Sequence, residues 1–398
     1  MKFSVATNFD DRLIEGLRGY PVHDLFGKLS ADAVGGGRSS YMLGPVSKRR
    51  LESHIRAAHG AGFEFNYLLN AACLDNHEYT SSGQKEIRRL LDYLEGLGVD
   101  SVTVALPYLM RLVKRSYPRL KVRISVFAQI DTVSKARWWA DNGADALTLD
   151  SLGVNREFDT LRAIRRAVPV ELQLMVNNHC LARCPMAGYH MNVLGHSSQA
   201  NHASGGFVID HCFLSCTAQK LRTPVDYVRG EWIRPEDLRH YEDIGYTWFK
   251  IVERSSPTDV LVNRVRAYSG RRYDGNLLDL VQPFGYDKES KFFWSWRMLW
   301  GFSSLRFSFL NRVRHLAARR GWLQKLSGAP VRMENRRLDG FIERFLTRGC
   351  RDMDCEKCRY CHGWAEKAVT VDPVFRTECL ENTEAVMEAV ESGRAWRS

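Results

Sequence analysis

Residues 146–176 read ALTLDSLGVNREFDTLRAIRRAVPVELQLMV, and this stretch contains one complete strand–helix–strand pattern. Residues 146–149 and 170–176 are short apolar runs, which are typical of buried strands. Residues 155–167 carry apolar side chains at helical spacing opposite several arginines, which predicts an amphipathic helix. Because two strands joined by a helix usually pair in parallel through a right-handed crossover, this segment indicates an α/β fold.

The same alternation extends along most of the chain. Further strands are predicted at residues 3–7, 63–69, 101–106, 122–127 and 247–252, and further helices at residues 48–59, 82–97 and 132–142. Seven strands with one still unplaced fit a closed barrel of about 250 residues better than an open sheet. We therefore expect a TIM-like parallel (β/α) barrel over residues 1–286. A basic, aromatic helical appendage over residues 287–349 and a cysteine-rich, metal-binding segment over residues 350–398 should follow it.

Composition restricts the cellular setting and the partners. No uncharged apolar stretch of the sequence is long enough for a membrane helix, and no secretory signal is visible. We therefore expect a cytoplasmic protein. Ten cysteines in that compartment favour metal ligation or catalysis over disulfides. The formal charge of +11 favours polyanionic partners.

Positive charge is concentrated in the predicted appendage. Residues 288–348 contain 14 Lys and Arg against 4 acidic residues, interspersed with aromatic side chains. The aromatic residues are Trp294, Trp296, Trp300, Phe302, Phe307 and Phe309. This composition suits RNA or an anionic membrane surface. The alternative is that the aromatics pack on the barrel and the charges form a solvated face.

Four cysteines form two CxxxC pairs, which we call the barrel-mouth cysteines: Cys180, Cys184, Cys212 and Cys216. Four thiolates are the usual complement of a [4Fe–4S] cluster. Structural zinc more often uses CxxC knuckles, so the spacing favours iron–sulfur over zinc. Buried structural thiols are the remaining alternative.

A second group, which we call the C-terminal cysteines, consists of Cys350, Cys355, Cys358 and Cys361. The last three are spaced by two residues as in a ferredoxin-type run, which favours a second iron–sulfur cluster. Zinc is the alternative, because Cys355 and Cys358 form a CxxC knuckle and His362 adds a possible ligand.

Two segments carry a resemblance to a known family. Residues 178–190, NHCLARCPMAGYH, are similar to the cysteine-bearing block of the U32 "peptidase" family, and residues 250–254, KIVER, resemble that family's conserved strand. The resemblance implies a barrel with a [4Fe–4S] cluster. Other members resemble oxygen-independent hydroxylases that act on tRNA, ribosomal RNA or a quinone precursor, some with prephenate as oxygen donor.

Candidate site residues lie mostly at the carboxyl ends of the strands, where barrel enzymes place their active sites. We predict catalytic roles for Glu253, Arg254, His190 and Asn178. We predict substrate binding by Asn70, Gln129, Asp150, Arg38 and Lys250. Arg254 is suited to clamp a carboxylate, and Glu253 to act as acid or base. Alternatively, Glu253 and Arg254 form only a structural salt bridge. Arg38 follows three glycines, Gly35 to Gly37, whose amides suit an anion or a plain tight turn.

These features of the sequence are consistent with three functions. The favoured one is a redox enzyme that uses its cluster and an electron-donor protein for oxygen-independent hydroxylation, or a related transformation, of a small anionic organic substrate. The second is a peptidase or other hydrolase with structural clusters, although no GxSxG or HExxH motif is present. The third is an RNA-binding or RNA-modifying protein.

Overall fold

The computed structural model describes residues 1–40, 45–281, 301–320 and 329–397. Eight parallel strands close into a barrel in chain order, and β1 pairs with β8 to complete the ring. The strands are β1 (Lys2–Ala6), β2 (Val22–Gly27), β3 (Glu64–Leu69), β4 (Ser101–Val104), β5 (Lys121–Ile124), β6 (Ala146–Thr148), β7 (Glu171–Met175) and β8 (Trp248–Ile251). The predicted TIM-like barrel is thereby confirmed.

The strand that sequence patterning left unplaced is β2. Its Asp24 is fully buried inside the barrel, where the Arg123 guanidinium binds it at 3.1 Å. Arg123 in turn lies over the ring of Trp248, 4.2 Å from the centroid. Burying a charge is tolerated here because it is paired. In β2 only Leu25 and Phe26 are adjacent apolar residues, between Asp24 and Gly27, and this run is too short to mark a strand. The strand predicted at residues 170–176 is consequently the seventh.

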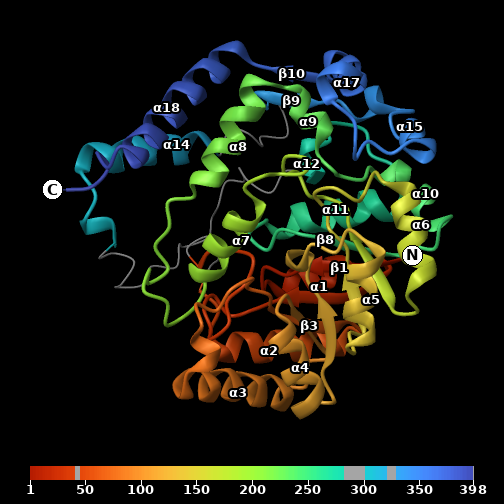
Figure 1. Cartoon of the computed structure of the whole chain (residues 1–398), viewed down its shortest axis with the longest axis vertical. Coiled ribbons are helices and arrows are strands. Elements are labelled where there is room, and N and C mark those ends of the chain that lie inside the picture. Colours follow the sequence, from red (N-terminus) through yellow and green to blue (C-terminus); the bar gives the residue numbers. More distant parts are fainter. Residues whose placement is uncertain (41–44, 282–300, 321–328, 398) are drawn as a thin grey trace.

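Helices surround the barrel between successive strands (Figure 1). They are α1 (Asp11–Leu17), α2 (Lys48–Gly60), α3 (Ser81–Gly96), α4 (Pro107–Ser116), α5 (Val133–Asp141), α6 (Phe158–Ala167) and, after β8, α11 (Thr258–Ser269). In α6 the buried residues are Phe158, Leu161 and Ile164, which confirms the amphipathic helix. α1 and α4 were not predicted.

The connection from β7 to β8 is much longer than the others. It contains α7 (Ala187–His196), α8 (His211–Arg222), α9 (Val225–Arg229) and α10 (Leu238–Glu242). Loops of this length in compact domains tend to be functional. It carries all four barrel-mouth cysteines.

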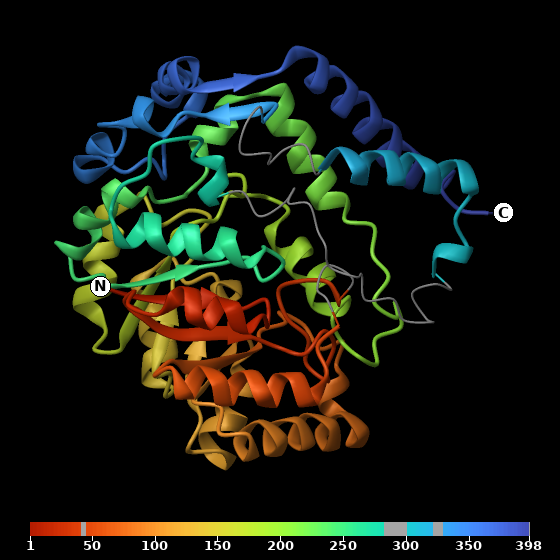
Figure 2. The ribbon, with the colours of Figure 1, turned by 180° about the vertical axis from the view of Figure 1, so that it is seen from behind.

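The C-terminal extension lies on the side of the molecule away from α2 and α3 (Figures 1 and 2). After α12 (Leu278–Val281) it comprises α14 (Phe307–Arg320), β9 (Val331–Met333), α15 (Glu343–Thr347), α16 (Cys355–Cys358), α17 (Tyr360–Ala368), β10 (Val369–Val371) and α18 (Pro373–Glu391). Helices predominate, as predicted, and β9 and β10 add an antiparallel pair.

The extension shares one continuous hydrophobic core with the barrel. Helix α18 runs beside α8 (Figure 1), and an ion pair and a histidine–carboxylate hydrogen bond connect them. The Arg222 guanidinium lies 2.6 Å from Glu384, and His211 Nε2 lies 2.8 Å from Glu391. The last described helix therefore supports the helix that bears Cys212 and Cys216.

Part of the predicted basic, aromatic appendage falls outside the described residues, including Trp294, Trp296, Trp300 and the proposed boundary at residues 286/287. Of the remaining aromatics, Phe309 is buried and Phe307 is 80% exposed. Phe302 contacts the ring of Phe207 at a centroid distance of 4.9 Å. None of the helices in the described residues has the length and hydrophobicity that a membrane span requires.

Candidate functional site

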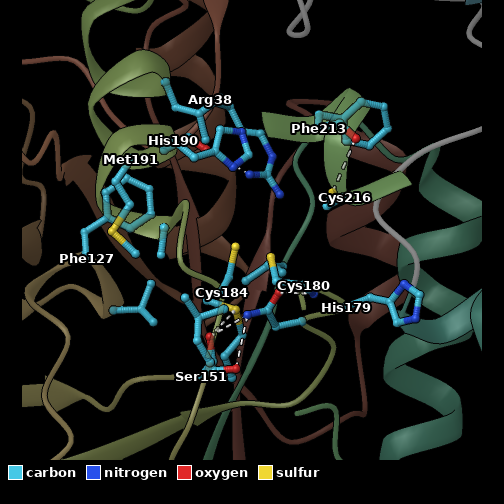
Figure 3. Close-up of a pocket in the computed structure, with 18 of the residues that line it drawn as sticks. Arg38, Phe127, Ser151, His179, Cys180, Cys184, His190, Met191, Phe213 and Cys216 are labelled. Atoms are coloured by element: carbon cyan, nitrogen blue, oxygen red, sulfur yellow. Dashed lines mark hydrogen bonds between the residues drawn. The ribbon is translucent and has the colours of Figure 1, made fainter. Parts of the chain in front are cut away.

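A cavity of about 210 Å³ opens at the carboxyl ends of the barrel strands. All four barrel-mouth cysteines line it, and Figure 3 shows Cys180 and Cys184 together with Cys216 on the neighbouring segment. Its walls are mainly apolar, with Phe26, Phe127, Leu152, Met191, Leu194 and Phe213 among the lining residues. Such a cavity with a few convergent polar groups has the usual form of a ligand site.

The two cysteine pairs reach the cavity from different elements. Cys180 and Cys184 lie in the loop between β7 and α7, whereas Cys212 and Cys216 lie one turn apart on α8. Asp210 caps this helix by accepting a hydrogen bond from the Phe213 amide at 3.0 Å. Residues four apart share a helix face, so the cap and the helical spacing together direct both α8 thiols to one side.

Burial raises the pKa of three of these thiols: that of Cys180, that of Cys212 to about 11 and that of Cys216 to about 12. Cys184 contributes to the increase in all three cases, which shows that the two pairs are close in space. Metal ligation requires thiolates, so a bound metal would displace protons from these groups.

Lys220 extends the row of Cys212 and Cys216 along α8 by one further turn. It is buried and lines the cavity, and its Nζ donates a short hydrogen bond to the carbonyl oxygen of His179. His179 stacks on Tyr227, and burial followed by the charge of Lys220 holds the pKa of the imidazole well below its usual value. Lys220 therefore adds a positive charge beside the cysteines, and we did not predict it.

The residues fit an iron–sulfur cluster better than a single ion. In the described part of the chain, no three His, Cys, Asp or Glu side chains are grouped closely enough to hold one metal ion. A [4Fe–4S] cluster takes one thiolate on each of four irons, so its four ligands surround a volume and do not meet at a point. Four thiols around one cavity, with Lys220 nearby, have this arrangement.

Glu253 is paired with Arg38. The Arg38 Nε and Nη2 groups donate to Glu253 Oε2 at 3.1 and 2.9 Å, and the Ser255 amide donates to Oε1 at 3.1 Å. Burial favours the neutral acid, but Arg38 and Ser255 outweigh it and lower the pKa of Glu253 to about 2. Glu253 also has a φ of 101°, which is strained for a side-chain-bearing residue. Glu253 thus forms its salt bridge with Arg38, and the Glu253–Arg254 salt bridge considered from the sequence is not the pair that forms.

Arg254 is buried at the cavity wall, and its Nη1 and Nη2 atoms have no hydrogen-bond partner. Burial, followed by repulsion from Arg38, lowers the pKa of its guanidinium to about 10. Lys250 is also buried in the cavity wall, above the ring of Phe26. Burial, followed by Arg123, lowers its pKa to about 7. Arg254 and Lys250 are buried with few acidic or acceptor groups near them, so the cavity has a strong preference for an anion.

Three further predicted residues line the cavity. Asn178 donates to Ser151 Oγ at 2.7 Å and accepts from the Cys180 amide at 3.1 Å, so it shapes the cysteine loop. Asn70 leaves its Oδ1 without a partner. His190, labelled in Figure 3, lies next to Asp210, with Nε2 and Oδ2 3.2 Å apart.

The glycines before Arg38 have another role than the predicted anion turn. The Gly35 amide donates to Asp32 Oδ1 at 2.7 Å, and the Gly36 amide donates to Ser198 Oγ at 2.8 Å. Gly35 has a φ of 80°, and a side chain there would collide with the Gly195 carbonyl. These glycines therefore pack the loop against α7, and two of their amides are already occupied.

Gln129 and Asp150 lie outside the cavity lining. Gln129 ends the short helix η3 (Val126–Ala128), and Lys135 of α5 binds its carbonyl oxygen at 2.9 Å. Asp150 is buried and accepts a hydrogen bond from the Leu152 amide at 3.1 Å. Burial raises its pKa to about 6. Both residues follow strand ends, but the turns that follow β5 and β6 hold them in other contacts.

Comparison with known proteins identifies several relatives. Residues 30–203 match the model of peptidase family U32. An uncharacterized protease of Methanocaldococcus jannaschii is 29% identical over 338 residues, which cover 85% of this chain and 86% of the relative. The tRNA hydroxylation protein P of Escherichia coli is 27% identical over 168 residues, or 40% of this chain. The match spans only 35% of that protein.

Among solved structures, one described as a U32 peptidase aligns with a TM-score of 0.46 and 23% identity. The alignment covers 63% of this chain and 92% of that one. The U32 family match contains Arg38, Cys180 and Cys184 and ends before Cys212.

Proposed function

We propose that the protein is an iron–sulfur redox enzyme of the U32 type, because residues 30–203 match the model of peptidase family U32, as the sequence resemblance predicts. Its reaction is an oxygen-independent hydroxylation, or a related transformation, of a small organic substrate that carries a carboxylate. The similarity to tRNA hydroxylation protein P supports hydroxylation as the type of reaction.

The main evidence for a carboxylate substrate is the guanidinium of Arg254, whose terminal nitrogens have no hydrogen-bond partner. A buried arginine with two free terminal nitrogens is costly unless a ligand supplies the acceptors. A carboxylate matches this fork with two parallel hydrogen bonds. Lys250 adds a second cation on the same wall, while Arg38 is already neutralised by Glu253. One carboxylate bound by Arg254 would thus supply both missing acceptors and compensate the buried charge of the guanidinium.

The barrel-mouth cysteines would hold the cluster. When bound, an iron–sulfur cluster supplies one-electron redox chemistry. The protein's own residues bind and enclose the substrate: Arg254 and Lys250 orient its anionic group, and the apolar wall excludes water. Phe127 and Met191 belong to this wall.

The hydrolase alternative lacks a suitable nucleophile in the described cavity lining. Ser204 Oγ and His202 Nδ1 lie 2.9 Å apart, but they belong to one local turn. Thr7 Oγ1 lies 2.7 Å from His54, which contacts Asp11 at 3.0 Å, but Thr7 is fully buried. Neither Ser204 nor Thr7 lines the cavity. The open cavity also favours an enzyme over a purely RNA-binding barrel.

The substrate class is tested with a pair of probes that differ only in charge, phenylacetate and phenylacetamide. Calorimetric titration of anaerobically purified protein should show tighter binding of the carboxylate. Charge-assisted hydrogen bonds are worth about 1.5–3 kcal/mol, so Arg254→Gln should weaken phenylacetate binding about 10- to 150-fold and leave phenylacetamide little changed. Arg56→Gln, on the exposed face of α2, is the matched control.

Equal binding of the two probes to the wild-type protein would contradict the carboxylate assignment. The redox assignment has a separate test, because anaerobically purified protein must contain iron and acid-labile sulfide. Zinc without iron would exclude it.

A further inference from the structure

The C-terminal cysteines gather around a second, smaller cavity of about 30 Å³. All four line it, together with Arg229, Arg344, Phe345, Met353 and Tyr360. None of these residues lines the barrel cavity, so the two groups of cysteines form separate sites. Nothing in the proposed function uses the second one.

Local backbone structure brings these cysteines together. Asp354 caps α16 by accepting hydrogen bonds from the amides of Glu356 and Lys357 at 3.0 and 3.4 Å. The single turn that follows places Cys355 and Cys358 on one face. Arg359 then adopts a left-handed conformation, with a φ of 50°, and the chain changes direction before Cys361 on α17.

The surroundings suit a negatively charged group. Arg229 lines the small cavity and also donates to Glu356 at 2.8 Å, and Arg344 lies over the ring of Tyr360 at 4.6 Å. A metal centre with four thiolates carries net negative charge, which these arginines offset. The aromatic rings of Phe345 and Tyr360 shield one side from water.

Cys350 is attached to the barrel through a specific set of contacts. The Arg183 guanidinium donates to the Cys350 carbonyl and to Glu157 Oε1, each at 2.8 Å, and lies 4.0 Å from Cys350 Sγ. The Cys350 amide also donates to Glu157 Oε1, at 2.9 Å. A Cβ on Gly349 would overlap the Glu157 carboxylate, so the approach is close. Arg183 directly precedes Cys184, which places the second site next to the loop of the first.

From these observations we propose that the C-terminal cysteines bind a second iron–sulfur cluster, distinct from the one at the barrel mouth. Their CxxCxxC run with a fourth cysteine matches ferredoxin-type ligation. A zinc ion would need four donors at about 2.3 Å from one point. In the described residues no such group of three or more donors is present, whereas a small void lies among the thiols.

The test is metal analysis of the full-length protein after anaerobic purification, for the wild type and two double variants. Since each [4Fe–4S] cluster takes four cysteines, the wild type should contain about eight irons and about eight sulfides per chain. Cys355→Ser/Cys358→Ser should reduce iron roughly by half. Cys180→Ser/Cys184→Ser should do the same by removing the barrel-mouth cluster. Cys73→Ser, outside both cavities, should leave iron unchanged.

The two double variants separate this proposal from the proposed function. Iron that is unaffected by Cys355→Ser/Cys358→Ser, or stoichiometric zinc lost with these cysteines, would overturn the second cluster only. Iron that is unaffected by Cys180→Ser/Cys184→Ser would overturn the barrel-mouth cluster only. If Cys355→Ser/Cys358→Ser is insoluble, the barrel variant, Cys180→Ser/Cys184→Ser, is sufficient to test the second cluster. Any iron that remains in it must be bound by the C-terminal cysteines. A barrel variant without iron would then refute the proposal.

Discussion

Replacing Arg254 with methionine is expected to stabilise the ligand-free protein, although the change removes the main binding group of the proposed site. Burial and the nearby Arg38 lower the pKa of Arg254 from 12.5 to about 10, so the folded protein disfavours its charged form. At about 1.4 kcal/mol for each tenfold change in proton affinity, the cost of the charge is about 3 kcal/mol. Methionine has a similar length and no charge, so it should recover much of this amount.

Urea unfolding at pH 7 in a buffer without carboxylates measures the effect. Arg254→Met should shift the midpoint to higher urea with an unchanged slope, for a gain of up to about 3 kcal/mol in the free energy of unfolding. The matched control is Arg234→Met. Arg234 is equally buried but donates to Asn335 Oδ1 at 2.8 Å and to the Leu338 carbonyl at 2.6 Å.

Removing the partnered Arg234 should therefore cost about 3–5 kcal/mol, the opposite sign. A loss of stability in Arg254→Met similar to that in Arg234→Met would refute the reasoning. It would mean that Arg254 has acceptors within the protein and is not held ready for a ligand.

The remaining predictions concern charge, docking and partners. The folded-state pKa of Lys250, about 7, lies below its usual 10.5, so the unfolded chain binds more protons between these values and stability should rise with pH across this window. In Lys250→Met this rise should be smaller by up to about 1.4 kcal/mol per pH unit, and an unchanged slope would contradict the assignment. Gly349→Ala should displace Cys350 from Glu157 and lower the melting temperature, whereas Gly363→Ala, with open space around it, should not. Equal melting temperatures for the two variants would argue against close docking. Finally, filter binding with tRNA and with anionic vesicles tests the basic residues 288–348. Any binding should weaken as salt rises, and binding to neither at low salt would remove the case for a polyanionic partner.

The fold was largely predictable from the sequence because most strands are short segments rich in apolar and β-branched residues that alternate with amphipathic helices. The exception is β2, in which His23 and Asp24 leave only Leu25 and Phe26 as adjacent apolar residues. The partner of Asp24, Arg123, lies on another strand, and nothing local in the sequence indicates that the two charges meet. Polar residues inside a barrel are therefore the main source of error in this kind of prediction.

The site was predictable to the extent that it follows strand ends and cysteine spacing. All four barrel-mouth cysteines line one cavity, while the iron–sulfur cluster itself stays a prediction. The pairing of Glu253 with Arg38 was not foreseen, because it joins segments far apart in the chain. Lys220 was also missed, although its position one turn after Cys216 on α8 is a signal that the sequence contains.

The support of α8 by α18 has a practical consequence for producing the protein. Helix α18 ends at Glu391, and its contacts to Arg222 and His211 hold the helix that bears Cys212 and Cys216. A purification tag fused after residue 398 would be separated from Glu391, which contacts His211, only by residues 392–398. The first residue precedes β1 at the amino end of the barrel, opposite the cavity. Tags are therefore best placed at the amino terminus, and protein with a carboxyl-terminal tag should be checked for cofactor loss before its activity is interpreted.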